Sequence, residues 1–217
     1  MGDFQTALTA LQASFLDPAG EFNGGVYHVY GAGLGDILNP IFEVPTAPFI
    51  KFRAHISFIA DAEPGDLRVT SKTLDRTADP TMTQVIFGVT GLSSAYAITV
   101  SGSATAAFPI IRNEELILLR AEANIGLGNF GLAEGDMNIV RAAADLADYA
   151  GTDGTNALDR LLHEKRYSLF VEGHRWVDMR RYGRLGDLPI DRSGDPARAD
   201  DVVHPRQPRP VDEESSN

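Results

Sequence analysis

The sequence predicts a mainly α fold with a small β component, and three observations support this. Two segments near residues 113–127 and 132–146 repeat apolar residues at the three- and four-residue spacing of a helix face. A third, Ala157–Leu188, shows the same spacing. The first half is interrupted by glycine and proline and has only short alternating stretches. We therefore expect a helical core, long irregular loops and one small hairpin.

The first two amphipathic segments predict an antiparallel helix pair. Asn113 is a favourable N-cap, and Glu114 and Glu115 suit the positive end of the helix dipole. Gly128 and the residues after it supply the turn. Over about 34 residues the pair is tetratricopeptide-like. One such unit cannot bury both of its faces, so other parts of the chain are expected to pack against it.

The third segment, Ala157–Leu188, predicts a C-terminal helix that faces the core. Gly173 lies inside it, and a helical glycine costs about 1 kcal/mol relative to alanine. We therefore expect Gly173 to admit a neighbouring backbone. Trp176 is the one tryptophan of the chain, and we expect it to seat this helix on the helix pair.

The charged residues of this segment favour a structural role. Glu172, Arg175 and Asp178 are spaced three apart, which predicts ion pairs along one helix. Glu164 follows a histidine, but the second histidine of a metalloprotease motif is absent. No catalytic residues, metal site or cofactor are predicted. A hydrolase that uses Glu164 and Glu172 is the weakest hypothesis.

The first half offers a short helix and a candidate binding loop. Asp3 is expected to cap an amphipathic helix that begins at Phe4. Residues 21–48 are irregular, and long irregular segments in compact domains are often functional. Aromatic rings stack on sugar faces, and amides and carboxylates bind hydroxyls. The candidate ligand-binding residues are Tyr27, His28, Tyr30, Asp36 and Asn39. The alternative is that the two tyrosines merely anchor the loop on the core.

Strand signals are short. Arg68–Leu74 alternates weakly, and Gln84–Thr90 with Tyr96–Val100 predicts a hairpin. We expect a single domain over residues 1–217, with an irregular and hairpin region at 1–108, a helical core at 109–188 and an extended tail at 189–217.

Composition excludes several functions. With no cysteine, the chain has no disulfides or thiolate chemistry. A net charge of -11 and a pI near 4.8 argue against nucleic-acid binding. No apolar run approaches the roughly 20 residues of a membrane-spanning helix. The sequence as given has no signal peptide and no lipid-accepting cysteine.

Two stretches, PIIRNEELILLRAEANIGLGN and LLHEKRYSLFVEGHRWVDMRRYGRL, resemble the C-terminal region of the SusD/RagB family of bacterial nutrient-uptake proteins. The matching positions include Arg112 and Glu115, the run Leu119–Ala123, and Glu164. The structural signature of the family falls on Glu164, Glu172, Gly173, Arg175, Trp176 and Asp178. GVYHVYGAGLGDILNP and GDLRVTSKT are similar to the middle region of the family.

The resemblance implies a binding protein rather than an enzyme. It implies a helical scaffold with ligand-binding loops, lipid-anchored at the outer face of the outer membrane. The implied partners are an oligosaccharide or another nutrient and a SusC-like TonB-dependent transporter. We expect the chain to be a C-terminal portion of such a protein, in contact with a membrane only through an anchor that this sequence lacks. The alternative function is a tetratricopeptide-type scaffold that binds a partner protein.

Overall fold

The computed structural model describes residues 2–83 and 94–188. It divides into two compact units, Met1–His174 and Arg175–Asn217, and each is described by itself. The first unit holds the helical core, both small sheets and the candidate site.

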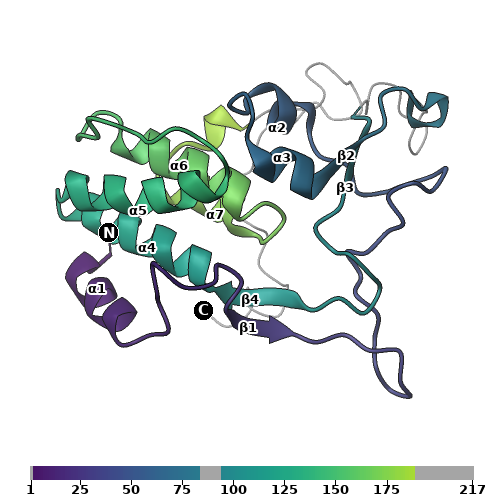
Figure 1. The fold of residues 1–217 in the computed structure, drawn as a ribbon, viewed down its shortest axis with the longest axis horizontal. Coiled ribbons are helices and arrows are strands. Elements are labelled where there is room, and N and C mark those ends of the chain that lie inside the picture. The colour runs from purple at the N-terminus through teal and green to yellow at the C-terminus, as the bar shows by residue number, and fades with distance from the viewer. Residues whose placement is uncertain (1, 84–93, 189–217) are drawn as a thin grey trace, which may run out of the picture. The chain divides into compact units, whose positions relative to one another are not determined.

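The described residues form seven α-helices, two short 3-10 helices (η) and four short strands (Figure 1). In chain order they are α1 (Phe4–Gln12), β1 (Gly25–His28), α2 (Ile56–Ala60), α3 (Leu67–Lys72), β2 (Thr73–Asp75), η1 (Pro80–Thr83), β3 (Tyr96–Ile98), β4 (Phe108–Arg112), α4 (Asn113–Gly126), α5 (Phe130–Ala143), α6 (Ala157–Ser168), α7 (His174–Arg181) and η2 (Leu185–Asp187). This confirms the predicted mainly helical class.

The core lies where α4, α5 and α6 meet. Helices α4 and α5 form the predicted hairpin, and α6 packs against both. The predicted apolar face of α5 is buried as expected. The largest buried group comprises Ile117, Leu118, Ala121, Ala133, Met137, Val140, Leu161 and Leu169.

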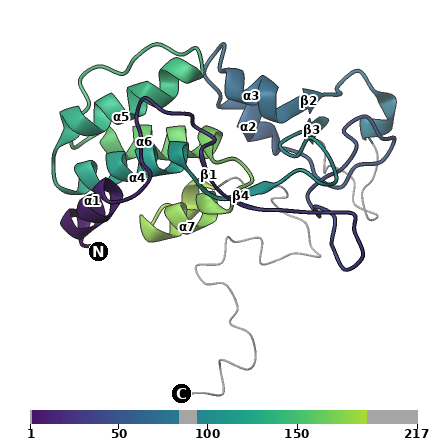
Figure 2. The same ribbon diagram turned by 60° about the horizontal axis from the view of Figure 1, so that its bottom comes forward.

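Helix α1 covers another face of α4 (Figure 2). Asp3 caps α1 as predicted and accepts a hydrogen bond of 3.0 Å from the Thr6 N–H. A side chain at Gly126 would collide with the Phe4 ring, since an added Cβ would lie 2.3 Å from it. The prediction of a close backbone approach at Gly173 is wrong, because among the described residues no atom lies within 4 Å of a Cβ added there.

The prediction that Asn113 caps α4 is wrong. The capping position is Arg112, and Asn113 is the first helical residue. The Asn113 amide instead holds the preceding loop, because it donates to the Asp17 carbonyl at 2.7 Å and accepts from the Asp17 N–H at 2.9 Å. The first N–H groups of α4 donate to loop carbonyls, including that of Gly24. A sequence pattern does not reveal such remote acceptors.

The prediction of one helix over Ala157–Leu188 is also wrong. Helix α6 ends at Ser168 and α7 begins at His174. Between them, Val171 has a φ of 72° and Gly173 a φ of 87°. These are left-handed conformations that a helix interior does not contain. Gly173 thus turns the chain between two helices.

Each sheet is an antiparallel strand pair. Strand β1 pairs with β4, with an irregularity between Val26 and Tyr27. Strand β2 pairs with β3, so β3 confirms a strand within the predicted Tyr96–Val100 segment. The expected partner Gln84–Thr90 lies outside the described residues, as does the predicted tail at 189–217. The stretch Arg68–Leu74, expected as a strand, is mainly the helix α3, because Asp66 caps its first turn.

The second unit contains most of α7. Arg181 donates to Asp178 at 2.7 Å, three residues earlier in the helix. The Arg180 guanidinium lies 5.4 Å from the Trp176 ring centre. In the described ranges, helices long and apolar enough to cross a membrane are absent.

Candidate functional site

A pocket of about 660 Å³ opens in the first unit beside the β1–β4 pair, α3 and the end of α6. We call it the Lys72 pocket. Its volume lies within the range that small-ligand sites occupy. It is lined by Phe22, Asn23, Tyr27, Arg68, Ser71, Lys72, Thr99, Val100, Ala107, Phe108, Pro109, Arg112, Glu114, Val140, Ala143, Ala144, Phe170 and Glu172.

Arg112 organises one wall of this pocket. Its guanidinium makes a bidentate ion pair with Glu172, with Nη2 to Oε1 at 2.9 Å, and also pairs with Glu114. Nη2 also donates to the Ser168 carbonyl at 2.6 Å, at the C-terminus of α6. A cation is favourable there because it neutralises the negative end of the helix dipole. The two carboxylates hold the pKa of Arg112 above its usual range, although burial opposes them.

Lys72 completes this arrangement from the last residue of α3. Its Nζ donates to the Tyr167 carbonyl at 2.6 Å and also to that of Ser168. Burial lowers the pKa of Lys72 to about 8, because the charged form loses its hydration. Within residues 2–83 and 94–188, Nζ has no carboxylate within ion-pair distance.

The pocket also presents aromatic and neutral polar groups. Four rings line it, from Phe22, Tyr27, Phe108 and Phe170. Hydroxyl and amide groups stand beside them. Rings with nearby polar groups are the combination that a sugar ring needs, because sugars present both apolar faces and hydroxyls.

The five predicted loop residues do not converge on one point. Tyr27 lines the Lys72 pocket from β1, and its hydroxyl donates to the Asn23 carbonyl at 2.6 Å. The rings of His28 and Tyr30 lie 4.5 Å apart, centre to centre, and form a small aromatic surface. His28 is exposed and Tyr30 is half-buried.

Asp36 and Asn39 shape the loop. Asp36 accepts a hydrogen bond of 3.1 Å from the Gly33 N–H. Asn39 is buried, and its amide donates to the Ser101 hydroxyl and the Ala106 carbonyl and accepts from the Ile41 N–H. The Asn39 amide therefore supports the loop from within, whereas Asp36 stays exposed.

A second group of charges surrounds Glu164, and all but the half-buried Glu63 are buried. We call it the Glu164 cluster: Glu63, Asp66, Arg68, Arg141 and Glu164. Glu164 is fully buried. One of its oxygens accepts from Arg68 at 2.6 Å and the other from Arg141 at 2.8 Å. Arg68 also pairs with Asp66, and Arg141 with Glu63. The cluster ties α3, α5 and α6 together, which agrees with the predicted structural role of Glu164.

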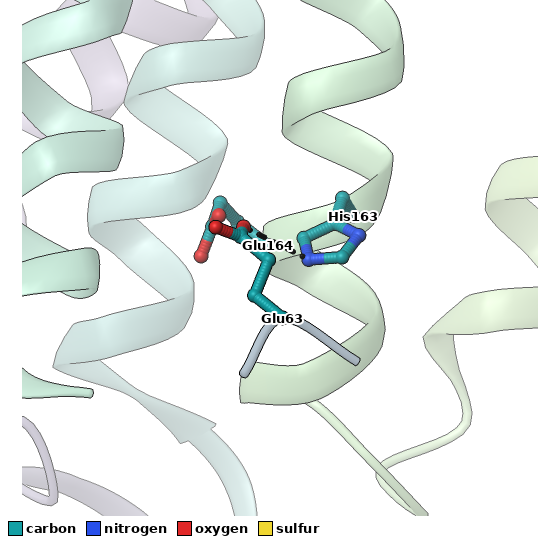
Figure 3. A group of neighbouring side chains, drawn as sticks. All are labelled: Glu63, His163 and Glu164. Atoms are coloured by element: carbon teal, nitrogen blue, oxygen red, sulfur yellow. Dashed lines mark ion pairs between the residues drawn. The ribbon is translucent and has the colours of Figure 1, made fainter. Parts of the chain in front are cut away.

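Glu63, His163 and Glu164 have the residue types of a metal site, and their potential ligand atoms lie within 4.8 Å of one another (Figure 3). The electrostatics oppose a cation there. Arg141 already donates to both oxygens of Glu63 and to Glu164. This arginine alone opposes the cation, because His163 is itself neutral: burial lowers its pKa, and its Nε2 lies 3.4 Å from Glu63. The two glutamates of the trio are best explained as members of the ion-pair network of Arg141.

Sequence reasoning missed most of these contacts. Arg68 and Glu164 are 96 positions apart, and Arg112 and Glu172 are 60 apart. Glu172 was expected to pair along a helix with Arg175, but it precedes α7 and its carboxylate binds Arg112. The resemblance did single out Arg112, Glu164 and Glu172, although not as partners.

Fold and site together define a class: a helical hairpin scaffold with long loops and a pocket whose charged groups are mostly ion-paired. A model of the SusD family matches residues 70–214, so the chain belongs to the SusD family. No enzyme family is indicated. A search of curated proteins gave no match.

One of the similar solved structures supports the fold. A SusD superfamily protein from Parabacteroides distasonis is 16% identical, with a TM-score of 0.56 over 82% of this chain and 45% of that one. At this identity the similarity supports the fold alone. One from Bacteroides vulgatus is 25% identical over 56% of this chain and 30% of that one, with a TM-score of 0.45. Surface glycan-binding protein A from Bacteroides thetaiotaomicron is 17% identical over 63% and 33%, with a TM-score of 0.46. The chain thus spans less than half of each of these proteins.

Proposed function

We propose that this chain belongs to the nutrient-binding component of an outer-membrane uptake system, and that the nutrient is an oligosaccharide. The match to the SusD family over residues 70–214 carries this proposal. SusD-family proteins bind glycans without catalysis, and the pairing of the buried charges in this chain is consistent with that.

The proposed transport partner is a SusC-like TonB-dependent barrel. The SusD family is associated with the outer membrane at the cell surface, and attachment there through a lipid anchor is part of the proposal. The interaction is tested by co-purification of the full-length native protein with its membrane fraction. A transporter barrel in the purified complex is the expected result, and a protein that elutes alone from that fraction would contradict it.

For the ligand surface we propose Tyr27, His28, Tyr30 and Asp36, with Asn39 holding their loop. The aromatic groups suit stacking on sugar rings, and Asp36 is an exposed acceptor for hydroxyls. Tyr27 links this surface to the Lys72 pocket because it lines both.

Binding of the purified chain to a glycan array, followed by calorimetry on the best glycan, tests the function. Tyr27→Ala is expected to weaken binding about tenfold, equivalent to ~1.4 kcal/mol. Tyr27→Phe keeps the ring and is expected to bind nearly as well as wild type. Phe15→Ala, an exposed aromatic residue outside the loop, is the matched control. Equal binding by all three variants would contradict the loop assignment.

The scaffold alternative gains no support from the described helices. Such a scaffold needs an open helical face, whereas α4 is packed against α1, α5 and α6. Ten of its residues are buried.

A further inference from the structure

We propose that the Lys72 pocket binds a saccharide that carries a carboxylate, and that the Lys72 ammonium is the ion-pair partner of this carboxylate. This inference rests on the proposed glycan-binding function and names the ligand class and the recognising residue.

The first step is the incomplete hydrogen bonding of Lys72. An ammonium has three donors. Two of them reach the carbonyls of Tyr167 and Ser168 at the end of α6. In the part of the chain that the structure describes, no further acceptor or carboxylate binds Nζ. One charged donor of a largely buried group, on the wall of a pocket, is therefore left for a ligand.

The second step is that the other cations of the pocket are already used. Arg68 is engaged by Asp66, Glu164 and the Ser168 hydroxyl. Arg112 is engaged by Glu114, Glu172 and a carbonyl. Both guanidiniums are thus bound by groups of the protein itself. Lys72 is the lining cation that lacks a carboxylate partner among the described residues.

The third step concerns the carboxylates that face Lys72. Glu114, from α4, and Glu172, from the segment before α7, both favour its charged form, whereas Arg112 and Arg68 oppose it. Both carboxylates are bound to Arg112, and neither reaches Nζ. A ligand carboxylate in direct contact would supply the missing partner. Charge-assisted hydrogen bonds of this kind are roughly twice as strong as neutral ones, more so away from bulk water.

The fourth step favours a sugar over a bare anion. A pocket of about 660 Å³ is far larger than one carboxylate requires. Its four rings offer stacking surfaces, and Asn23, Ser71 and Thr99 offer hydrogen bonds for hydroxyls. A uronic acid combines all three features in one residue: an apolar ring face, hydroxyls and a carboxylate.

Calorimetry on the full chain tests the proposal, with the trimer of galacturonic acid as probe and galactotriose as its neutral counterpart. At pH 7 the acidic trimer is expected to bind at least about tenfold more tightly, because only it makes the ion pair. Lys72→Met should abolish this preference. Lys51→Met removes an exposed lysine outside the pocket and should preserve it. Sodium acetate tests the bare carboxylate and should bind far more weakly than the trimer.

The outcomes separate the two proposals. Equal affinity for both trimers overturns this inference and leaves glycan binding standing. If the chain binds neither trimer but does bind other neutral glycans, the inference is also overturned and glycan binding still stands. A preference for the acidic trimer that survives in Lys72→Met, or acetate binding of equal strength, also overturns it. Absence of binding to any glycan overturns the proposed function as well.

A measurement on the wild type avoids dependence on the folding of Lys72→Met. Because burial lowers the pKa of Lys72 to about 8, the free protein loses the ammonium as the pH rises from 7 to 9. Affinity for the acidic trimer should fall about tenfold over this interval, while affinity for any neutral glycan stays constant. An acidic-trimer affinity that is constant with pH would overturn the role of Lys72.

Discussion

The Glu164 cluster and the Lys72 pocket both involve residues of α6, but their charged groups have different kinds of partner. Around Glu164, each oxygen of a fully buried carboxylate receives a guanidinium from another element of the chain. Around Lys72, one ammonium caps two carbonyls of α6 and lacks a carboxylate partner within the described ranges. The comparison teaches that an internally paired cluster serves the fold, whereas a cation that faces a pocket without a partner can serve a ligand.

The two regions differ because of what surrounds them. Glu164 faces inward, where α3, α5 and α6 meet, and the Tyr149 hydroxyl also donates to it at 2.8 Å. Removing a partner there leaves a charge with no access to water. Lys72 lies at the end of α3 and lines a cavity. We therefore expect a substitution there to change ligand binding and the contacts with α6, and to leave the rest of the core in place.

The largest expected effect tests the internal cluster. Glu164→Gln leaves Arg68 and Arg141 without their shared carboxylate, and breaking a buried ion pair costs about 3–5 kcal/mol. We expect this loss in the free energy of unfolding, measured by urea denaturation. Asp61→Asn is the matched control, because Asp61 is exposed and pairs with Arg166. Its expected cost is below about 1 kcal/mol.

Equal losses in Glu164→Gln and Asp61→Asn would show that burial does not set the cost, and the distinction between the two regions would fail. A loss of unfolding free energy in Glu164→Gln alone would support the distinction between the two regions. The binding of a neutral glycan by a folded fraction of Glu164→Gln should match that of the wild type, since Glu164 does not line the pocket.

The next effect is a pH dependence of stability that belongs to Lys72. Its pKa is about 8 in the folded chain and 10.5 without the fold, so the unfolded chain binds more protons between these values. The free energy of unfolding should therefore rise with pH by about 2 kcal/mol between pH 8 and 10. Denaturation of wild type and Lys72→Met across this range measures it.

Above about pH 10 the free energy of unfolding should fall as the pH rises. Burial raises the pKa of Tyr167 to about 12, and the pKa of Tyr149 is also raised. The folded chain then holds protons that the unfolded chain has lost, and stability falls. A flat profile from pH 8 to 10 in the wild type, or the same rise in Lys72→Met, would contradict the burial of the Lys72 ammonium.

The smallest effect comes from the turn that places Glu172 beside Arg112. Gly173 has a φ of 87°, so Gly173→Ala forces an alanine into the left-handed region at a cost of about 1 kcal/mol. Gly135→Ala is the control, since it lies inside α5 with open space around it. It should stabilise the chain by about 0.5–1 kcal/mol. Thermal denaturation gives both values. A Gly173→Ala variant as stable as the wild type would show that this position does not require a left-handed glycine.

Local patterns predicted much of the fold. Apolar spacing located α4, α5 and α6, and Asp3 was predicted as the cap of α1. Such patterns failed where remote contacts decide the structure. The weak alternation of Arg68–Leu74 predicted a strand, but capping by Asp66 and packing against α6 make α3. The break after Ser168 depends on Val171, a β-branched residue whose left-handed conformation no sequence signal indicates.

The candidate site was predictable only in part. The aromatic loop residues predicted Tyr27, which lines the pocket. Lys72 carries no local signal, because its burial and its contacts with α6 span more than 90 positions of sequence. The same distance separates Arg68 from Glu164. A single sequence gives residue types and spacing, but such pairings exist only after the chain has folded.

The most direct test of the central claim is the titration of the Lys72 side chain itself, by nuclear magnetic resonance of the chain with isotope-labelled lysine. The free protein should show one lysine with a pKa near 8, assigned by its absence in Lys72→Met. Saturation with the galacturonic acid trimer should raise this pKa, because the ligand carboxylate stabilises the ammonium. A Lys72 pKa near 10.5 in the free protein, or one that the trimer leaves unchanged, would contradict the account.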